Sequence, residues 1–341
     1  MKKVFLTWMA FFTAIVAADA QQIFNVQNGN RTVFFDDLET AVTEAVSGDT
    51  IYLPGGQIEL KNTLIINKKL ALIGVGADSI GQGTQMTRIT QPVHFISGSD
   101  GSLMTGCRIN NSLTIGKDGS DTIQNIMIFR NVITGNISFG LSENYYQQDV
   151  MKKIFIIENV INGHISKGIW VASPKECVIQ NNLFPFGTGA ASISGFSSSL
   201  IQNNIVTYIS DVESCIISNN IINRYFGNIG SNCVYENNAC FFENWLTGTN
   251  NTFHNNLMNQ SAEATFKNSA GSSPKDRELL SGSPCRNAGT DGTDIGIYGG
   301  SSPFKNGSVP INPHISKVNI SNVTDSEGKI KVDIKVSAQE R

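Results

Sequence analysis

The sequence predicts an all-β fold, a solenoid in which short strands wind into stacked coils. Three observations lead to this prediction. A short sequence repeat, with β-branched residues on both sides of an Asn-Asn pair, recurs along the chain, as in Cys177–Phe184 and Ser199–Val206. The apolar segments are only four to five residues long and are broken by asparagine, glycine or serine, which suits strands and tight turns. One such unit cannot bury its own apolar face, whereas stacked units share a continuous core.

The second asparagine of each pair is expected to mark the same corner on successive coils. Asparagine tolerates the left-handed backbone that a sharp corner needs. When the corner recurs, the side-chain amides can stack and hydrogen-bond along the axis of the solenoid. A polar stripe for a ligand is the alternative interpretation of these residues. The expected structural ladder consists of Asn131, Asn159, Asn182, Asn204, Asn220, Asn238 and Asn256.

This pattern resembles the right-handed parallel β-helix proteins of the pectate-lyase-like architecture, with their internal asparagine ladder. The resemblance covers most of the chain and implies a single-stranded right-handed parallel β-helix. It implies no particular activity, because this architecture carries lyases, hydrolases, esterases, adhesins and inert structural proteins.

The N-terminus is typical of a signal peptide, which we assign to residues 1–20. Lys2 and Lys3 provide the positive start, Val4–Ala18 the apolar run, and Ala18-Asp19-Ala20 a small-residue cleavage site. We therefore expect an exported protein, located in the periplasm, on the cell surface or in the medium.

Residues 21–57 are expected to form an N-terminal cap with one helix at about 36–46. Leu38, Ala41, Val42, Ala45 and Val46 recur at helical spacing. Residues 36 and 39 fit a capping box, and a glycine at position 48 is a natural stop. The segment resembles the caps of secreted β-helix proteins. A cap is needed because the first coil would otherwise expose its core and an unpaired edge.

Residues 58–300 are expected to form the parallel β-helix, with about ten to eleven coils and a length of roughly 50 Å. Its last part, Ser281–Gly300, resembles the closing segment of exported bacterial β-helix proteins and is expected to finish the last coil. In the tail, residues 301–341, apolar and charged residues alternate from Ile330 to Val336, which predicts a β-hairpin with one buried face. We expect this hairpin to cover the C-terminal end of the rod. A secretion or attachment signal is the alternative.

The six cysteines form no CxxC pair, so the sequence supports no zinc site. Three cysteines occupy the same position in their copies of the repeat: Cys177, Cys215 and Cys233. Ser199 occupies this position in the copy between Cys177 and Cys215. Neighbouring coils are close enough for a disulfide between Cys215 and Cys233. A column of small buried side chains is the alternative, and the pattern favours it.

Composition and motifs restrict the function. Charged residues make up 16% of the 341 residues and the net charge is −3, so no basic surplus points to nucleic acid. No apolar stretch beyond the N-terminus is long enough to span a membrane. The calcium-ligand cluster of pectate lyases and the catalytic series of polygalacturonases are both absent, so no catalytic residue is assigned. Residues 118–121 and 291–294 resemble calcium loops only superficially, and ordinary turns explain them better. We expect no cofactor, and calcium, which no motif supports, is the alternative.

Aromatic and charged residues provide candidates for contact with sugars. Rings on one side of the repeat can form a track for sugar stacking, and an arginine can hold an acidic sugar. Packing of the rings inside the rod or against loops is the alternative. The candidate substrate-binding residues are Tyr145, Tyr146, Trp170, Tyr208, Arg224, Tyr225, Glu243 and Trp245.

Carboxylates for acid–base chemistry can also meet from successive coils. A glycosidase pair needs a separation of about 5 to 9.5 Å, which adjacent or alternate coils can supply. The candidates are Asp211, Glu213, Glu236 and Glu243. Solvated surface positions are the alternative interpretation.

The sequence thus favours an exported β-helix protein that binds an extended polysaccharide and can cleave it, as a polysaccharide lyase or a glycoside hydrolase. This function is inferred by analogy of fold. The alternative is a non-catalytic surface protein, an adhesin or a scaffold.

Overall fold

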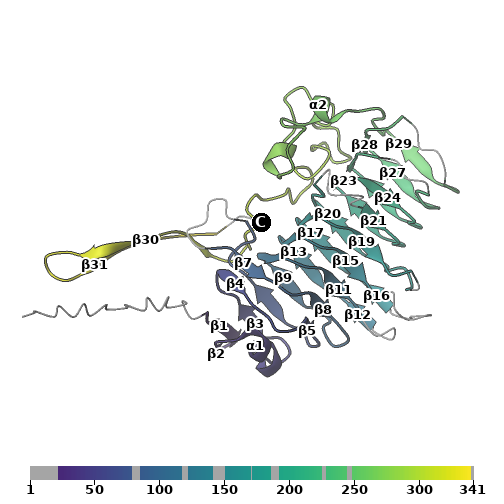
Figure 1. Ribbon diagram of the computed structural model, residues 1–341. Helices are drawn as coiled ribbons and strands as arrows, with labels where there is room; N and C mark the ends of the chain where they lie inside the picture. The colour runs from purple at the N-terminus through teal and green to yellow at the C-terminus, as the bar shows by residue number, and fades with distance from the viewer. Residues whose placement is uncertain are drawn as a thin grey trace, which may run out of the picture.

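The chain folds into a solenoid of parallel strands, shown in Figure 1. The computed structural model describes residues 22–78, 85–116, 122–140, 150–169, 171–185, 192–224, 228–243 and 248–338. Strands from successive coils stack in register into long sheets, so that side chains at equivalent positions form straight files along the rod. The predicted all-β solenoid is therefore confirmed.

Sheet A, the longest sheet, contains ten parallel strands that are extended at the N-terminal end by two antiparallel ones. Its strands are β2 (Arg31–Phe35), β1 (Phe24–Asn28), β3 (Thr50–Tyr52), β6 (Ala71–Ile73), β9 (Leu103–Thr105), β13 (Met127–Phe129), β17 (Phe155–Ile157), β20 (Val178–Gln180), β22 (Leu200–Gln202), β25 (Ile216–Ser218), β27 (Val234–Glu236) and β29 (Thr252–His254).

In each coil, sheet B comes after sheet A along the chain. Sheet B has a five-stranded part and a three-stranded part, and Leu183 joins them through one β-bridge to each. Its strands are β4 (Gly56–Ile58), β7 (Thr87–Ile89), β10 (Cys107–Ile109), β14 (Val132–Ile133), β18 (Val160–Ile161), β23 (Ile205–Val206), β26 (Ile221–Ile222) and β28 (Ala239–Cys240).

Sheet C forms the third face of the rod. Its strands are β5 (Leu64–Ile66), β8 (Val93–Phe95), β11 (Leu113–Ile115), β15 (Ile137–Phe139), β19 (Ile165–Lys167), β21 (Ser192–Ser194) and β24 (Tyr208–Ser210). Strands β12 (Thr122–Gln124) and β16 (Val150–Lys152) form a short parallel pair at the corner between sheets C and A. On the later coils, isolated β-bridges continue this pairing along the same corner.

The core lies inside the coils and follows from the alternation of side chains along each strand. The middle residue of a sheet A strand points inward, and because the strands are in register, these residues stack as one file. Members of this file are fully buried: Ile51, Leu72, Met104, Ile128, Ile156, Ile179, Ile201, Ile217 and Tyr235.

The asparagine ladder runs along the corner between sheets A and B. Asn204 is representative: its Nδ2 donates to Asn220 Oδ1 and to the carbonyl of Ile179, both at 2.9 Å. Its own Oδ1 accepts from the backbone N–H and the Nδ2 of Asn182, both at 3.0 Å. The same contacts join all seven predicted asparagines from 131 to 256, so the predicted ladder is present as a single file.

The residue that precedes each ladder asparagine makes the corner. These residues have φ between 48° and 56°, which is the left-handed region that asparagine tolerates better than other non-glycine residues. They are Arg130, Glu158, Asn181, Asn203, Asn219, Asn237 and Asn255. Their side chains leave the corner on the opposite side from the ladder.

Helix α1 (Leu38–Glu44) and strands β1 and β2 cover the N-terminal end. The helix is shorter than predicted and its N-cap is Asp37 rather than residue 36. The carboxylate of Asp37 accepts hydrogen bonds from the backbone N–H groups of Glu39 and Thr40, which fixes the first turn at Leu38. At the other end, Ala45 is already extended, so the predicted continuation to residue 46 is wrong.

Residues 285–310, here called the return segment, run back along the outside of sheet B. The expectation that this region finishes the last coil is wrong. After the last coil the chain forms two short helices, α2 (Ala262–Thr265) and η1 (Lys275–Arg277), and then returns toward the N-terminal end. The reason is a second apolar core between the return segment and sheet B. Its main members are Leu183, Ile205, Ile221, Ala239, Phe266, Leu279, Cys285, Ile295, Ile297 and Phe304.

The corner side chains hold the return segment in place. Asn237 Nδ2 donates to the carbonyl of Ala288 at 2.8 Å. Asn219 and Thr290 exchange two hydrogen bonds of 2.9 and 3.0 Å. Further toward the N-terminal end, Asn181 Nδ2 donates to two carbonyls of the segment at 2.8 and 2.9 Å. The Asn-Asn pairs therefore have two separate roles, because the second asparagine joins coils and the first binds the return segment.

A buried ion pair replaces these asparagines on the two earliest corners. Arg130 Nε and Glu158 Oε2 lie 2.8 Å apart, with side-chain exposures of 1% and 0%. Glu158 also accepts from the hydroxyl of Ser302 and the backbone N–H of Lys305, and Arg130 donates to the carbonyl of Val309. The pair thus anchors the end of the return segment by charge-assisted hydrogen bonds.

The C-terminal hairpin consists of β30 (His314–Thr324) and β31 (Ile330–Ser337). Figure 1 shows it projecting away from the rod, so the expectation that it covers the C-terminal end is wrong. The return segment has already carried the chain past that end, since the carbonyl of Ser308 accepts from the backbone N–H of Ala77. The apolar residues of β31 are exposed, so the predicted buried face of the hairpin is not buried.

All six cysteines are buried free thiols. Cys177, Ser199, Cys215 and Cys233 occupy one inward-facing column, in which the backbone N–H of Cys177 donates to Ser199 Oγ and that of Cys215 to Cys233 Sγ. Burial raises the pKa of Cys177 to about 11, which keeps its thiol protonated. The structure therefore shows the column of small side chains and not the Cys215–Cys233 disulfide.

We expect Asn204→Ala to lower the free energy of unfolding by about 3 kcal/mol, because the change leaves buried N–H and carbonyl groups of neighbouring coils without partners. Urea denaturation measures this loss. The matched control is Asn319→Ala, at an exposed position of β30, for which we expect a change within about 0.5 kcal/mol. Equal effects of the two changes would contradict a stabilising ladder.

We expect Glu158→Gln to destabilise the protein by about 3 kcal/mol, because Arg130 is left as a buried charge without its counter-ion. The double change Arg130→Met with Glu158→Leu is expected to be milder, since it removes both charges together. Denaturation curves of the two variants provide the comparison. If the double variant is as unstable as the sum of the losses measured for Arg130→Met alone and Glu158→Leu alone, the two charges are not coupled.

Candidate functional site

A polar cleft of about 440 Å³ lies at the corner between sheets C and A, toward the C-terminal end of the rod. Three successive coils contribute to it through residues 211–213, 228–231 and 248–249. Its lining consists of Asp211, Val212, Glu213, Asn228, Gly230, Ser231, Gly248 and Thr249.

The stacking of the coils places these side chains side by side. Glu213, Ser231 and Thr249 pair with one another as consecutive parallel bridges, so they form one file at the corner. Gly230 lies beneath them with φ of 106°, and a Cβ there would come within 1.9 Å of the carbonyl oxygen of Val212. Glycine is therefore required at this position, both for its backbone conformation and for the close approach of the coils.

A hydrogen bond between two of the coils positions one carboxylate. Asn228 Nδ2 donates to Asp211 Oδ1 at 2.9 Å, and Asn228 Oδ1 accepts from the backbone N–H of Gly230 at 3.0 Å. Asp211 and Glu213 are both exposed. The cleft therefore offers two solvated carboxylates, an amide and two hydroxyl groups, a set suited to a ligand rich in hydroxyl groups.

The structure brings together only part of the predicted site. Of the four acidic candidates, Asp211 and Glu213 lie in the cleft. Glu236 lies on sheet A beside His254, on another face, and Glu243 is exposed beyond β28. The expectation that two acids from successive coils approach each other is not met by Asp211 and Glu213, because both lie on one coil, and Glu236 lies on sheet A, which faces another direction than the corner.

The other predicted binding residues divide into two groups. Tyr208 is half-buried on β24, on the same coil as Asp211, and Arg224 is exposed after β26. Five candidates lie outside the described residues: Tyr145, Tyr146, Trp170, Tyr225 and Trp245. The described residues that follow two of them in sequence, Asn228 and Gly248, belong to the wall of the cleft.

Sequence reasoning missed Asn228, Ser231 and Thr249. For Ser231 and Thr249, the spacing from the inward-facing column of cysteines indicates the alignment. Glu213 stands two residues before Cys215, Ser231 two before Cys233, and Thr249 two before the asparagine that continues the column. Residues at that offset share a corner, so the register could have predicted their alignment.

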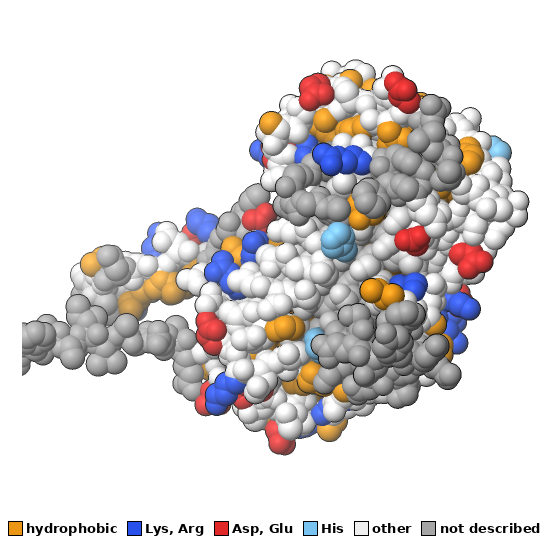
Figure 2. Space-filling view, turned by 45° about the vertical axis from the view of Figure 1, so that its right-hand side comes forward, with side chains coloured by type: hydrophobic (Ala, Val, Ile, Leu, Met, Phe, Trp, Pro, Cys, Tyr) orange, Lys and Arg blue, Asp and Glu red, His pale blue; other side chains and the backbone are white. Residues whose placement is uncertain are grey.

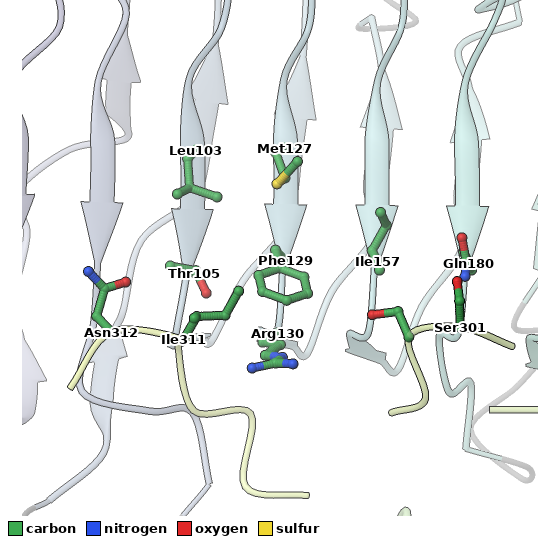
Figure 3. A pocket seen from close by; sticks show the side chains of 11 residues that line it. Leu103, Thr105, Met127, Phe129, Arg130, Ile157, Gln180, Ser301, Ile311 and Asn312 are labelled. Atoms are coloured by element: carbon green, nitrogen blue, oxygen red, sulfur yellow. The ribbon is translucent and has the colours of Figure 1, made fainter. Parts of the chain in front are cut away.

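A second cavity, of about 360 Å³, lies between sheet A and the end of the return segment (Figure 3). Leu103, Met127, Phe129 and Ile157 give it an apolar floor, and the guanidinium of Arg130 lies 4.5 Å from the centre of the Phe129 ring. Glu158 already neutralises Arg130, so this cavity is not an anion site. Its apolar floor suits a hydroxyl-rich ligand less well than the polar cleft does.

The turn at residues 291–294 uses its carboxylates locally. The hydroxyl and the backbone N–H of Thr293 donate to Asp291 and lower the pKa of that carboxyl. Asp294 accepts from the backbone N–H of Asn287. The arrangement is that of an ordinary turn. The other such segment, residues 118–121, lies outside the described residues.

Comparisons with known proteins add no assignment, since no protein-family model, no curated protein and no solved structure matches the chain. Within the described ranges, no three His, Cys, Asp or Glu side chains gather closely enough to hold a metal ion. Among the same residues, no helix has the length and apolar character needed to cross a membrane. The geometry of the cleft is therefore the basis for inferring a function.

Proposed function

We propose that the chain is an exported right-handed parallel β-helix protein of the pectate-lyase-like architecture, and that it binds an extended polysaccharide in the polar cleft. Two features support the architecture: the parallel sheets in register and the internal asparagine ladder. The signal-peptide pattern of residues 1–20 supports export.

The proposed class of ligand rests on one observation. Glu213, Ser231 and Thr249 repeat polar side chains at one corner, one coil apart, and Asp211 and Asn228 extend the same surface. A stacked solenoid presents such groups as an extended surface. A polysaccharide has hydroxyl groups that repeat along its length, so it can bond to this file with several sugar units at once.

The exposure of the carboxylates favours binding without cleavage. A glycoside hydrolase needs one carboxyl group that stays protonated as the general acid, and burial in an apolar environment is the usual means. Asp211 and Glu213 are both exposed, and neither has such an environment. We therefore place a non-catalytic glycan-binding role, such as that of a surface protein or adhesin, ahead of a lyase or hydrolase.

We expect Asp211→Asn combined with Glu213→Gln to weaken binding to the recognised polysaccharide about tenfold or more, because each change replaces a charge-assisted hydrogen bond by a neutral one that is roughly half as strong. A glycan array identifies the ligand and calorimetry measures the affinity. The matched control, Glu263→Gln, changes an exposed carboxylate on α2 and is expected to leave the affinity unchanged.

Two outcomes would contradict the proposal. Full affinity in the double variant would place glycan binding on another surface. Release of reducing sugars or unsaturated products by the native protein, lost in Glu213→Gln, would show that the cleft is catalytic.

Export has its own test. We expect mass spectrometry of the protein recovered from its own cells to give a chain that begins at Gln21. A chain that keeps residues 1–20 would contradict cleavage by a signal peptidase.

A further inference from the structure

The outer face of sheet A carries an uninterrupted row of apolar side chains, here called the apolar file. Each member is the first residue of its strand and stacks on the equivalent residue of the next coil. Met127 and Ile216 are 37% and 46% exposed, and the others are half-buried. The members are Leu103, Met127, Phe155, Val178, Leu200, Ile216 and Val234.

This file is unusual for a surface that faces water. Contiguous apolar patches on soluble proteins commonly mark interaction sites. The file begins at the second cavity, where Leu103 and Met127 form part of the lining, as Figure 3 shows. Beside the file, on the same strands, the border is apolar at Phe129 and Ile157 next to the cavity and polar farther along, at Gln180, Gln202 and Glu236.

The hairpin carries a matching apolar surface. Pairing between its strands places Val318 opposite Ile334 and Ile320 opposite Val332, on one face. The other face carries charged and polar pairs, Lys317 with Lys335 and Asn319 with Asp333. On β31 the apolar residues Ile330, Val332, Ile334 and Val336 are 52–59% exposed. Figure 2 shows hydrophobic side chains on the projecting hairpin.

An isolated two-stranded hairpin is at best marginally stable in water and needs another surface to pack against. The dimensions of the two apolar surfaces agree. The eight residues of β31 span roughly 26 Å, and the seven strands of the apolar file span roughly 29 Å at the usual spacing. Each surface can therefore cover the other along nearly its whole length.

The hairpin projects away from its own rod (Figure 1), although Ile311 and Asn312 just before it line the second cavity together with Leu103 and Met127 of the file. The return segment runs toward the N-terminal end of the rod, and the contact of Pro310 with Gly106 fixes its last residues there. Docking on the same rod would require the chain to reverse between Asn312 and His314. Pro313 opposes this reversal, because the residue before a proline favours an extended backbone. A second molecule can present its file without any reversal.

We propose that this protein forms a two-fold dimer in which the apolar face of each hairpin docks on the apolar file of the other copy. Such an exchange is self-complementary and closed, as two-fold interfaces are. The charged face of the hairpin stays in water. This proposal rests on the apolar file and the hairpin and not on glycan binding, although the cleft residues Glu213 and Ser231 precede the file members Ile216 and Val234 by only three positions.

The mass of the full chain in solution tests the proposal, measured by light scattering after size exclusion. We expect twice the monomer mass for the native protein. Ile216→Glu in the file and Ile334→Glu in the hairpin are each expected to give monomers. The matched control, Ile169→Glu, alters a position that is 75% exposed outside the file and is expected to remain dimeric.

Cross-linking between two single variants tests the pairing itself. Proteins carrying Ile216→Cys and Val332→Cys are mixed and treated with a thiol-specific bifunctional linker. We expect a covalent species of twice the monomer mass in the mixture, because only contact between different molecules can join these two residues.

Three results would overturn the proposal: a monomeric native protein, a dimer that survives both glutamate substitutions, or no covalent species in the mixture. An intact circular dichroism spectrum and a cooperative unfolding transition separate a lost interface, which lowers the midpoint only modestly, from a lost fold. If the native protein is monomeric and a chain with both cysteines is linked within itself, the hairpin covers its own rod.

Discussion

The hydrogen bonds of the asparagine ladder determine the register of the whole molecule. At each corner between sheets A and B the backbone turns sharply and leaves buried N–H and carbonyl groups that no strand can pair. The amide of Asn204, for example, satisfies groups on its own and on both adjacent coils. Leaving such groups without partners costs about 1–3 kcal/mol each. Coils that slip by one residue would lose these bonds and turn their core residues outward.

Every other file on the surface follows from this register. The corner residues line up because the ladder lines up, and they present a row of amides to the return segment. Asn181, Asn219 and Asn237 bind it by hydrogen bonds, whereas Arg130 and Glu158 bind its end as a buried ion pair. The cleft of Asp211 and Glu213 and the apolar file of sheet A arise in the same way.

The sequence allowed the periodic part of the fold to be predicted and left the non-periodic part undetermined. The Asn-Asn pairs identified the ladder because each repeat uses the same corner. The path of residues 285–310 was missed, since its partners are outward side chains of other coils and its own sequence has no period. The alternation in β31 correctly predicted a strand with one apolar face but not what that face meets. Of the acidic candidates, Asp211 and Glu213 line the cleft and Glu236 lies on sheet A, because sequence spacing alone does not distinguish corner positions from sheet positions.

The return segment also changes how the rod can come apart. A stack of repeats held only by neighbour contacts can fray from its ends, one coil at a time. Here a single stretch of chain is bonded to the coil of Asn237 at one end and to that of Ala77 at the other. Loosening the last coils therefore pulls on the first ones, and partial opening is penalised along the whole length. We therefore expect the coils to unfold as one cooperative unit. A protease then finds few partially unfolded states to cleave.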